Sequence, residues 1–306
     1  MTSVLLTGAG GFLGRQVLAA LVGRGYLVHA VRREKNGVED GHGVTWHELD
    51  LLDQGAVKTL MEVVRPSGLI HLAWDARHGI YWNSPTNLQW LAASLVLLDD
   101  FSRLGGKRAV VAGSCAEYQM GSLDPLDEFT SALIPDSLYG VSKNALRDVM
   151  SKWAPDAGIS WAWARFFNVF GPHEKANRLV PKVIRTLEQG SVLNFDSGSS
   201  LRDFLHVSDA ADALVTLFDS AVQGPVNIAS GEAFSVRDVV SALAVYLRAE
   251  KCVAFDVIPD QVGQPVSVLA RIARLRDEVG WHARVGSIDR MRETCDWWRS
   301  AEHRKK

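Results

Sequence analysis

Thr7-Gly8-Ala9-Gly10-Gly11-Phe12-Leu13-Gly14 directly follows a short apolar run and opens a stretch with helical periodicity. In a strand-loop-helix unit of this kind, the first glycine permits a tight turn and Gly11 lets the backbone approach a pyrophosphate, while Gly14 lets the helix lie close to the strand. The unpaired N–H groups at the start of the helix favour an anion. The stretch therefore predicts a dinucleotide-binding loop, with cofactor contacts from Gly8, Gly11, Phe12, Leu13 and Gly14.

Short apolar runs alternate with longer amphipathic stretches along the rest of the chain, as expected for βαβ units around a parallel sheet. We predict strands over 4–7, 27–31, 44–49, 69–73, 109–113, 161–167 and 225–229, and helices over 12–22, 54–64, 85–104, 138–154 and 206–220, the last capped by Ser208. The predicted fold is α/β, a doubly wound parallel sheet (Rossmann) with a smaller discontinuous C-terminal substrate domain. The dinucleotide-binding domain is expected over 1–168, with 206–233 returning to it, and the substrate domain over 169–205 and 234–306.

Composition limits the class of protein and of partner. The chain has 306 residues, of which 47% are hydrophobic and 22% are charged, and its formal net charge is −2. A net charge this close to zero provides no positive electrostatic field that would attract nucleic acid or an anionic membrane. No apolar run approaches the length of a membrane span. The start of the chain is expected to be a strand and not a signal peptide. Three scattered cysteines show neither a disulfide framework nor metal-ligand spacing, so we expect a cytoplasmic protein without a metal site.

The end of the second strand bears on the choice of dinucleotide. A carboxylate there accepts hydrogen bonds from the ribose 2′-hydroxyl of NAD, but this chain has Arg32 and Arg33. Planar guanidinium groups match a 2′-phosphate, so the sequence predicts NADP(H) over NAD(H), unless both arginines are ordinary surface charges. The other residues expected at the cofactor follow the third and fourth strands: Asp50 and Leu51 at the adenine, and Leu72, Ala73 and Trp74 along the crevice.

Tyr139 and Lys143 are four residues apart in a predicted helix and so lie on one face, about one turn from each other. A free phenol titrates near pH 10, and a nearby ammonium together with an oxidised nicotinamide favours the phenolate. Lys143 can also hold the nicotinamide ribose. Ser114 ends the fifth strand, where a hydroxyl points into the ligand crevice of an open α/β sheet. The three side chains are the predicted catalytic set, and the alternative for Tyr139 and Lys143 is a surface pair.

Together with Asp50-Leu51, His71 to Ala73, Arg165 to Pro172, Asn177 to Pro181 and Arg202 to Val207, these motifs resemble the extended short-chain dehydrogenase/reductase family, in its NAD(P)-dependent sugar epimerase/dehydratase branch. The resemblance covers nearly the whole chain. It implies that Ser114, Tyr139 and Lys143 are catalytic and that Phe166 flanks the nicotinamide. It also implies a homodimer through the helices 85–104 and 138–154. The residues expected to contact a nucleotide-diphosphate-sugar are Asn168, Asn177, Leu179, Val180 and Arg202, and Tyr81 is expected to stack on the substrate.

Departures from the family pattern narrow the chemistry. Sugar 4,6-dehydratases carry an Asp-Glu pair just after the catalytic hydroxyl, and Cys115-Ala116 stands there instead, which argues against dehydration. Cys115 is expected to point away from the site as a buried apolar side chain. Gln261 stands where the family usually has a phosphate-binding arginine, and Arg271 where an Asp is common. Arg271 supplies the missing charge, or the substrate is of another class.

These observations favour an NADPH-dependent ketoreductase of a nucleotide-diphosphate keto-sugar, of the 4-keto-6-deoxy type, with Tyr139 as the proton donor. The first alternative uses the same residues as an NAD(P)-dependent nucleotide-sugar 4-epimerase. The second is a non-catalytic NADP-binding regulator, which would need the glycine loop but no proton donor.

Overall fold

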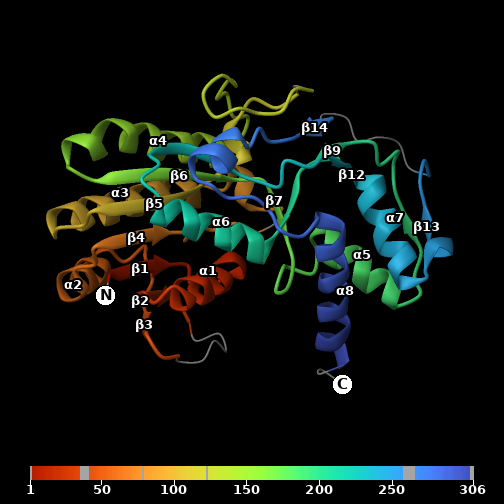
Figure 1. The fold of residues 1–306 in the computed structure, drawn as a ribbon, viewed down its shortest axis with the longest axis horizontal. Coiled ribbons are helices and arrows are strands. Elements are labelled where there is room, and N and C mark those ends of the chain that lie inside the picture. Colours follow the sequence, from red (N-terminus) through yellow and green to blue (C-terminus); the bar gives the residue numbers. More distant parts are fainter. Residues whose placement is uncertain (1, 35–40, 78, 122, 258–265, 304–306) are drawn as a thin grey trace.

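A computed structural model of the chain describes residues 2–34, 41–77, 79–121, 123–257 and 266–303. Its centre is a seven-stranded sheet in the order β11-β6-β5-β4-β1-β2-β3, in which all neighbouring strands are parallel (Figure 1). The strands are β1 (Ser3–Thr7), β2 (Leu27–Arg32), β3 (Val44–Glu48), β4 (Gly68–His71), β5 (Arg108–Ser114), β6 (Ser160–Phe166) and β11 (Gly224–Ile228). The strand order reverses between β1 and β4, which is where ligands bind in doubly wound sheets.

Helices cover both faces of this sheet because side chains alternate along its strands. Val4 and Leu6 of β1 pack against α1 (Phe12–Gly23) and α6 (Val207–Asp219). Leu5 points to the opposite face of the sheet. It lies in a second apolar core, which the sheet forms with the helices α2 (Gln54–Val64), α3 (Thr86–Arg103) and α4 (Leu138–Asp156). Among the described residues, no helix has both the length and the apolar character needed to cross a bilayer.

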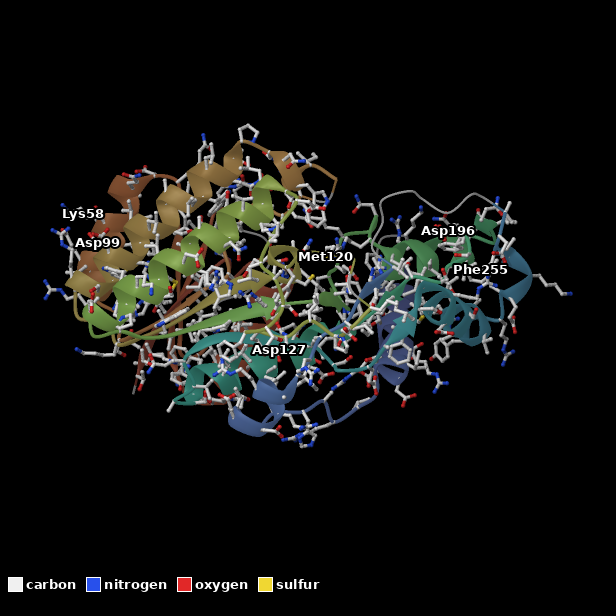
Figure 2. All side chains as sticks on the ribbon, turned by 90° about the horizontal axis from the view of Figure 1, so that it is seen from above. Lys58, Asp99, Met120, Asp127, Asp196 and Phe255 are labelled. Atoms are coloured by element: carbon white, nitrogen blue, oxygen red, sulfur yellow. The ribbon has the colours of Figure 1, made fainter. Side chains whose placement is uncertain are left out.

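A third core lies beyond the sheet. It is built from Val183, Ile184, Leu243 and Met291, on the helices α5 (Leu179–Glu188), α7 (Val236–Leu247) and α8 (Ser287–His303). In Figure 2, Asp196 and Phe255 lie in this part of the molecule, Lys58 and Asp99 lie at the far end of the sheet, and Met120 lies between the two. The expected domain boundaries stay a prediction.

Short strands connect the third core to the sheet. The strand β7 (Asn168–Phe170) pairs in parallel with β10 (Phe204–His206). The remaining strands are β8 (Leu193–Asn194), β9 (Leu201–Arg202), β12 (Phe234–Ser235), β13 (Val253–Ala254) and β14 (Ser267–Val268), and the short helical turns are η1 (Tyr81–Asn83), η2 (Cys115–Glu117), η3 (Glu250–Cys252) and η4 (Arg274–Glu278).

The predicted doubly wound sheet is confirmed, and each of its seven strands lies within two residues of its expected bounds. The predicted cap of α6 was wrong. His206 is the N-terminal cap, and its Nδ1 accepts a hydrogen bond from the backbone N–H of Ser208 at 3.3 Å. A histidine ring with an unprotonated nitrogen can take the accepting role that serine usually fills.

Candidate active site

The loop between β1 and α1 forms a cradle that side chains would fill. Gly8 has a φ of +70°, and a Cβ there would lie 3.0 Å from the backbone nitrogen of Ala73. A Cβ on Gly14 would lie 2.8 Å from the Cα of Ala9. Gly11 precedes α1, and no side chain caps this helix in the part of the chain that the structure describes. The first N–H groups of α1 therefore face a space lined by backbone, which fits the pyrophosphate of a dinucleotide.

Thr7 and His71 join β1 to β4 beside this cradle. The Thr7 Oγ1 lies 2.7 Å from the His71 Nδ1 and accepts hydrogen bonds from the backbone N–H groups of Leu72 and Ala73. The His71 Nε2 lies 2.9 Å from the hydroxyl of Ser94. Burial lowers the pKa of His71 to about 3, so its ring is neutral near pH 7. His71 thus fixes the switch point of the sheet.

Tyr139 stands in the first turn of α4. A Cβ on Gly140 would collide with the carbonyl oxygen of Ala116, in the turn that follows β5, so glycine lets this turn of α4 approach the end of β5. The Ser114 hydroxyl lowers the pKa of the Tyr139 phenol, and its Oγ accepts a hydrogen bond from the N–H of Ala116 at 3.2 Å. Burial, followed by the neighbouring Tyr81, raises the pKa of Tyr139 above its ordinary value. The expected lowering of this pKa by Lys143 together with an oxidised nicotinamide stays a prediction.

Lys143 lies one turn further along α4, with only 2% of its surface exposed. Its Nζ donates a hydrogen bond to the carbonyl of Ala112 at 2.8 Å. The same atom lies 3.9 Å from the centre of the Trp74 ring and 5.9 Å from that of Tyr139. Burial lowers the pKa of Lys143 to about 7, against the opposing effect of Glu117. The structure thus brings the predicted Ser114, Tyr139 and Lys143 together.

Aromatic rings surround the phenol of Tyr139. Trp74, Tyr81 and Trp82 each meet its ring edge-on, with centroids 6.3, 4.8 and 6.1 Å away. Tyr81 forms a side-chain hydrogen bond with Arg178, and burial raises its pKa to about 12. Tyr81 thus lies next to the predicted catalytic phenol, and its stacking on the substrate stays a prediction. Such a wall excludes water from the phenol and offers flat apolar surface to a ring.

Cys115 packs against the apolar core that contains Tyr118, Leu126 and Phe167, which agrees with the expected apolar side chain. The Ser114 hydroxyl and the charges of Arg202 and Arg178 also act on its thiol, and the expectation that it points away from the site stays a prediction. The strand ends at Ser114 and the turn η2 begins at Cys115, so the two-residue alternation of a strand no longer applies. Arg178 belongs to the Asn177 to Pro181 motif but was not among the residues expected to contact the substrate.

The other predicted substrate residues differ in how they are placed. Asn168 donates from Nδ2 to the carbonyl of Asp203 at 3.1 Å, and Arg202 donates from Nη1 to the carbonyl of Leu201 at 2.8 Å. Val180 packs in the third core, so its side chain is not free to meet a ligand. Asn177 is exposed, and Leu179 and Phe166 are half-buried. The Nε of Arg271 lies 3.5 Å from a carboxylate oxygen of Asp127. Gln261 lies outside the described residues.

At the far end of the crevice, Arg32 is buried and already paired. Its Nη2 donates to the Glu48 Oε1 at 2.8 Å, and its guanidinium lies 4.3 Å from the centre of the Trp46 ring. Arg33 is 73% exposed at its side chain. Glu48 was missed from the sequence, although Arg32 and Glu48 stand opposite each other in the β2–β3 register. Asp50 accepts from the N–H of Leu52 at 3.0 Å, and Leu51 is buried.

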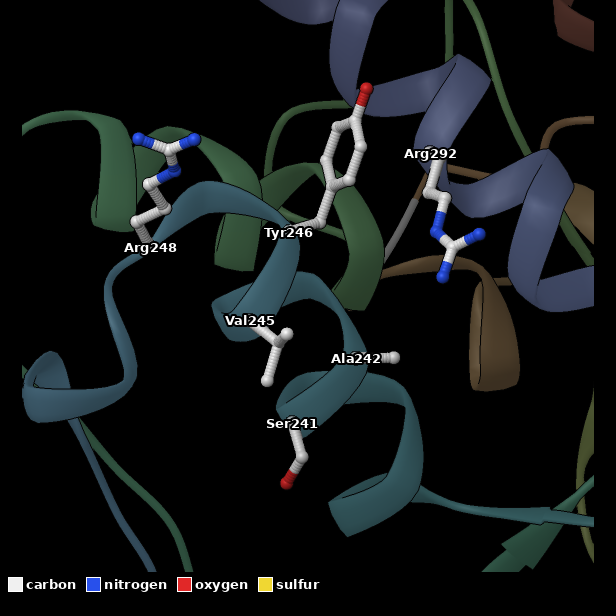
Figure 3. A pocket seen from close by; sticks show the side chains of 6 residues that line it. All are labelled: Ser241, Ala242, Val245, Tyr246, Arg248 and Arg292. Atoms are coloured by element: carbon white, nitrogen blue, oxygen red, sulfur yellow. The ribbon is translucent and has the colours of Figure 1, made fainter.

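A separate hollow of about 610 Å³ lies on α7 and α8, lined by Ser241, Ala242, Val245, Tyr246, Arg248 and Arg292 (Figure 3). The phenol of Tyr246 is hydrogen-bonded to Asp296. None of the predicted catalytic or cofactor residues lines this hollow.

A glycine cradle at the switch point of a doubly wound sheet, next to grouped serine, tyrosine and lysine side chains, defines a dinucleotide-dependent α/β enzyme. The chain belongs to the NAD dependent epimerase/dehydratase family, whose model matches residues 4–229. The predicted family is thereby confirmed, and the protein is an NAD(P)-dependent enzyme of that family.

Individual relatives are similar over most of their length. The UDP-glucose 4-epimerase of Erwinia amylovora is 26% identical over 96% of this chain and 97% of its own. The dTDP-6-deoxy-L-talose 4-dehydrogenase (NAD(+)) of Aggregatibacter actinomycetemcomitans is 26% identical over 78% of this chain and 88% of its own. The crystal structure of the Thermotoga maritima UDP-glucose 4-epimerase with UDP-glucose matches the fold with a TM-score of 0.90 and 21% identity, over 98% of this chain and 100% of that one.

Proposed function

We propose that the protein is a nucleotide-sugar 4-epimerase. The observation that carries this proposal is the grouping of Ser114 at the end of β5 with Tyr139 and Lys143 on α4, where the Lys143 Nζ lies 5.9 Å from the centre of the Tyr139 ring and donates to the Ala112 carbonyl of β5 at 2.8 Å. The whole-length similarity to UDP-glucose 4-epimerases supports the 4-epimerase over the ketoreductase that the sequence favoured.

The proton chemistry is assigned to Tyr139. A bound nicotinamide ring supplies the hydride acceptor and donor, and a positive charge when oxidised. Ser114 would hold the sugar hydroxyl while Tyr139, as the phenolate, takes its proton, and Tyr139 would return that proton to the same sugar oxygen once the carbon has the opposite configuration. Because burial raises the pKa of Tyr139, positive charge from Lys143 and an oxidised nicotinamide would be needed to favour the phenolate.

The two residues that follow Ser114 support a reaction confined to carbon 4 of the sugar, without dehydration. Burial raises the pKa of the Cys115 thiol to about 12, so this group stays neutral near pH 7. Ala116 carries no ionisable group. The pair cannot perform the two proton transfers that a dehydration requires.

A ketoreductase is the second candidate, favoured by the two arginines at the end of β2 and by similarity to a 4-dehydrogenase. An exchangeable NADPH suits net reduction of a keto-sugar, and Tyr139 would donate the proton in the same place. The two candidates differ in whether cofactor is consumed.

The preference for NADP(H) over NAD(H) is proposed from Arg32 and Arg33. The exposed Arg33 supports it, because a guanidinium can pair with a 2′-phosphate in two places at once. Glu48 opposes it, because this carboxylate holds Arg32 and would repel a phosphate. The NADP(H) preference therefore depends on Arg33, or on Arg32 leaving Glu48.

A homodimer through α3 and α4 is proposed from the apolar surface of these helices. Leu88 of α3 and Val141 and Val149 of α4 are large apolar side chains exposed to 56%, 48% and 45%. A groove lined by Leu95, Leu98, Asp99, Val149, Met150 and Trp153 runs between the two helices. Exposed apolar surface of this kind marks an interface. The cytoplasmic location stays a prediction.

The deciding experiment incubates the purified protein with UDP-glucose and UDP-galactose, with and without added NAD or NADP. Interconversion without net change in absorbance at 340 nm supports the 4-epimerase. Stoichiometric oxidation of NADPH with a 4-keto-6-deoxy nucleotide-sugar, and no interconversion, would replace it by the ketoreductase.

A further inference from the structure

A carboxylate lies buried directly behind the Ser114 end of β5. Glu117 and Arg165 pair at 2.7 Å between Oε2 and Nε, and both side chains are 0% exposed. The Glu117 Oε1 also accepts from the backbone N–H of Ser114 at 2.7 Å, and the Trp163 Nε1 donates to both carboxylate oxygens at 2.9 Å. Glu117 therefore binds the backbone of one predicted catalytic residue and the two nearest strands at once.

The chain is shaped to admit this carboxylate. A Cβ on Gly113 would lie 2.6 Å from the Glu117 Oε1 and would also collide with the Trp163 Nε1, so only glycine leaves room. The Nδ2 of Asn144, in α4, donates to the carbonyl of Glu117 at 3.2 Å. Glu117 is thus tied to β6 and also to β5 and α4, the two elements that carry Ser114, Tyr139 and Lys143.

Stability alone is a poor explanation for such a pair. Burying two charges removes their hydration, and apolar residues of the same volume often serve a core equally well. The charge of Glu117, in contrast, reaches the site. It raises the pKa of Lys143 against burial, and it raises the pKa values of Tyr139 and Cys115. The other titratable groups that face Lys143 are His71, neutral near pH 7, and Tyr139.

We propose that Glu117 is a positioning residue for the reaction, whose buried carboxylate holds the Ser114 backbone in place and sets the charge at the end of β5, where the Lys143 Nζ donates to the Ala112 carbonyl. The inference rests on the proposed function for its catalytic meaning. Arg165 serves this role indirectly, because its Nε fixes the carboxylate while its Nη1 donates to the Tyr118 hydroxyl at 3.1 Å.

The test measures Lys143 itself. The ¹³Cε resonances of labelled lysines are titrated in the full-length protein, and the Lys143 signal is assigned by its loss in Lys143→Met. Removal of a nearby negative charge disfavours the ammonium, so Glu117→Gln should move the Lys143 titration to lower pH by about one unit. The alkaline limb of the kcat profile should move with it.

Glu128→Gln is the matched control. Glu128 is buried beside the same Arg165, whose Nη1 donates to its carbonyl, and its Oε1 accepts from the N–H of Asn227 at 2.9 Å. This change should lower stability without moving the Lys143 titration, because Glu128 is not among the charges that act on Lys143.

Glu117→Asp separates charge from shape, and it also serves if Glu117→Gln does not fold. The shorter side chain retains the charge and cannot reach Ser114, so kcat should fall with little movement of the Lys143 titration. An unchanged Lys143 titration in folded Glu117→Gln, or an equal shift in Glu128→Gln, overturns the inference. A wild-type protein without epimerase or reductase activity overturns the proposed function instead, because the titration is read without turnover.

Discussion

The Nζ of Lys143 lies 3.9 Å from the centre of the Trp74 ring, so an ammonium that burial disfavours rests on the face of an indole. A desolvated cation–π contact of this kind stabilises the charged form by about 0.5–2 kcal/mol. Trp74 follows β4 and Lys143 belongs to α4, so the contact also joins the two sides of the crevice.

Replacing Trp74 by Leu should therefore lower the pKa of Lys143 further below its value of about 7. We expect kcat to fall more at pH 8.5 than at pH 6, because the ammonium is lost as pH rises. The measurement is a pH profile of turnover. Trp90→Phe is the control, since Trp90 stacks on Trp74 at 6.2 Å and does not contact the ammonium. Equal losses at both pH values would show that the indole only fills space.

Changing Tyr139 to Phe removes the proposed proton donor and leaves the ring in its aromatic enclosure. General acid–base catalysis contributes about 10²–10⁴ in rate, so kcat should fall by that factor. Cofactor affinity, measured by fluorescence titration, should be nearly unchanged. Tyr246→Phe, at the exposed tyrosine bonded to Asp296, should keep full activity. Undiminished turnover in Tyr139→Phe would end the proposed mechanism.

Cofactor preference is tested at Glu48 and Arg33. Glu48→Gln removes the charge that holds Arg32, so NADP(H) should bind more tightly, by about tenfold for one charge-assisted hydrogen bond gained. Arg33→Ala should weaken NADP(H) and leave NAD(H) unaffected. Dissociation constants for both cofactors are measured by calorimetry. Comparable constants for the two in the wild-type protein would contradict the NADP(H) preference.

The fold was predictable from local patterns, because apolar runs and Thr7 to Gly14 fix strands, helices and the switch point. The grouping of Tyr139 and Lys143 followed from helical spacing. Local patterns did not predict which side chains on neighbouring strands pair with each other. Arg32 was read as a free guanidinium because its partner Glu48 lies on the next strand.

Glu117 was missed for a related reason. Its partner Arg165 is 48 residues away, and no spacing rule links the two. Cys115 follows the last residue of β5 and begins the turn η2, so alternation along the strand does not give its direction. Sequence patterns describe the direction of side chains only within a regular element.

The proposed dimer is tested at Val149, which lines the groove between α3 and α4. Val149→Glu places a charge in a surface expected to be buried between two copies, so the mass in solution should fall to that of one chain. Val63→Glu, on α2 and 78% exposed, is the matched control and should leave the mass unchanged. Sedimentation at several concentrations gives the result. A wild-type protein with the mass of a single chain would contradict the dimer.

Glu174 gives a prediction about stability and pH. This buried carboxyl lies 3.5 Å from the Nε of Arg178, yet burial raises its pKa from 4.5 to about 7. A group whose pKa is higher in the folded chain stabilises the fold at low pH, and that contribution is lost as pH rises from about 4.5 through about 7. Glu174→Gln cannot titrate, so its unfolding free energy should fall less than that of the wild type between pH 5 and pH 8. The difference should be about 2 kcal/mol.

Urea unfolding at both pH values measures this difference. Glu62→Gln, at an exposed glutamate, is the control and should behave as the wild type. Parallel pH dependences for Glu174→Gln and the wild type would mean that the Glu174 carboxyl already ionises in the folded chain at its ordinary pKa.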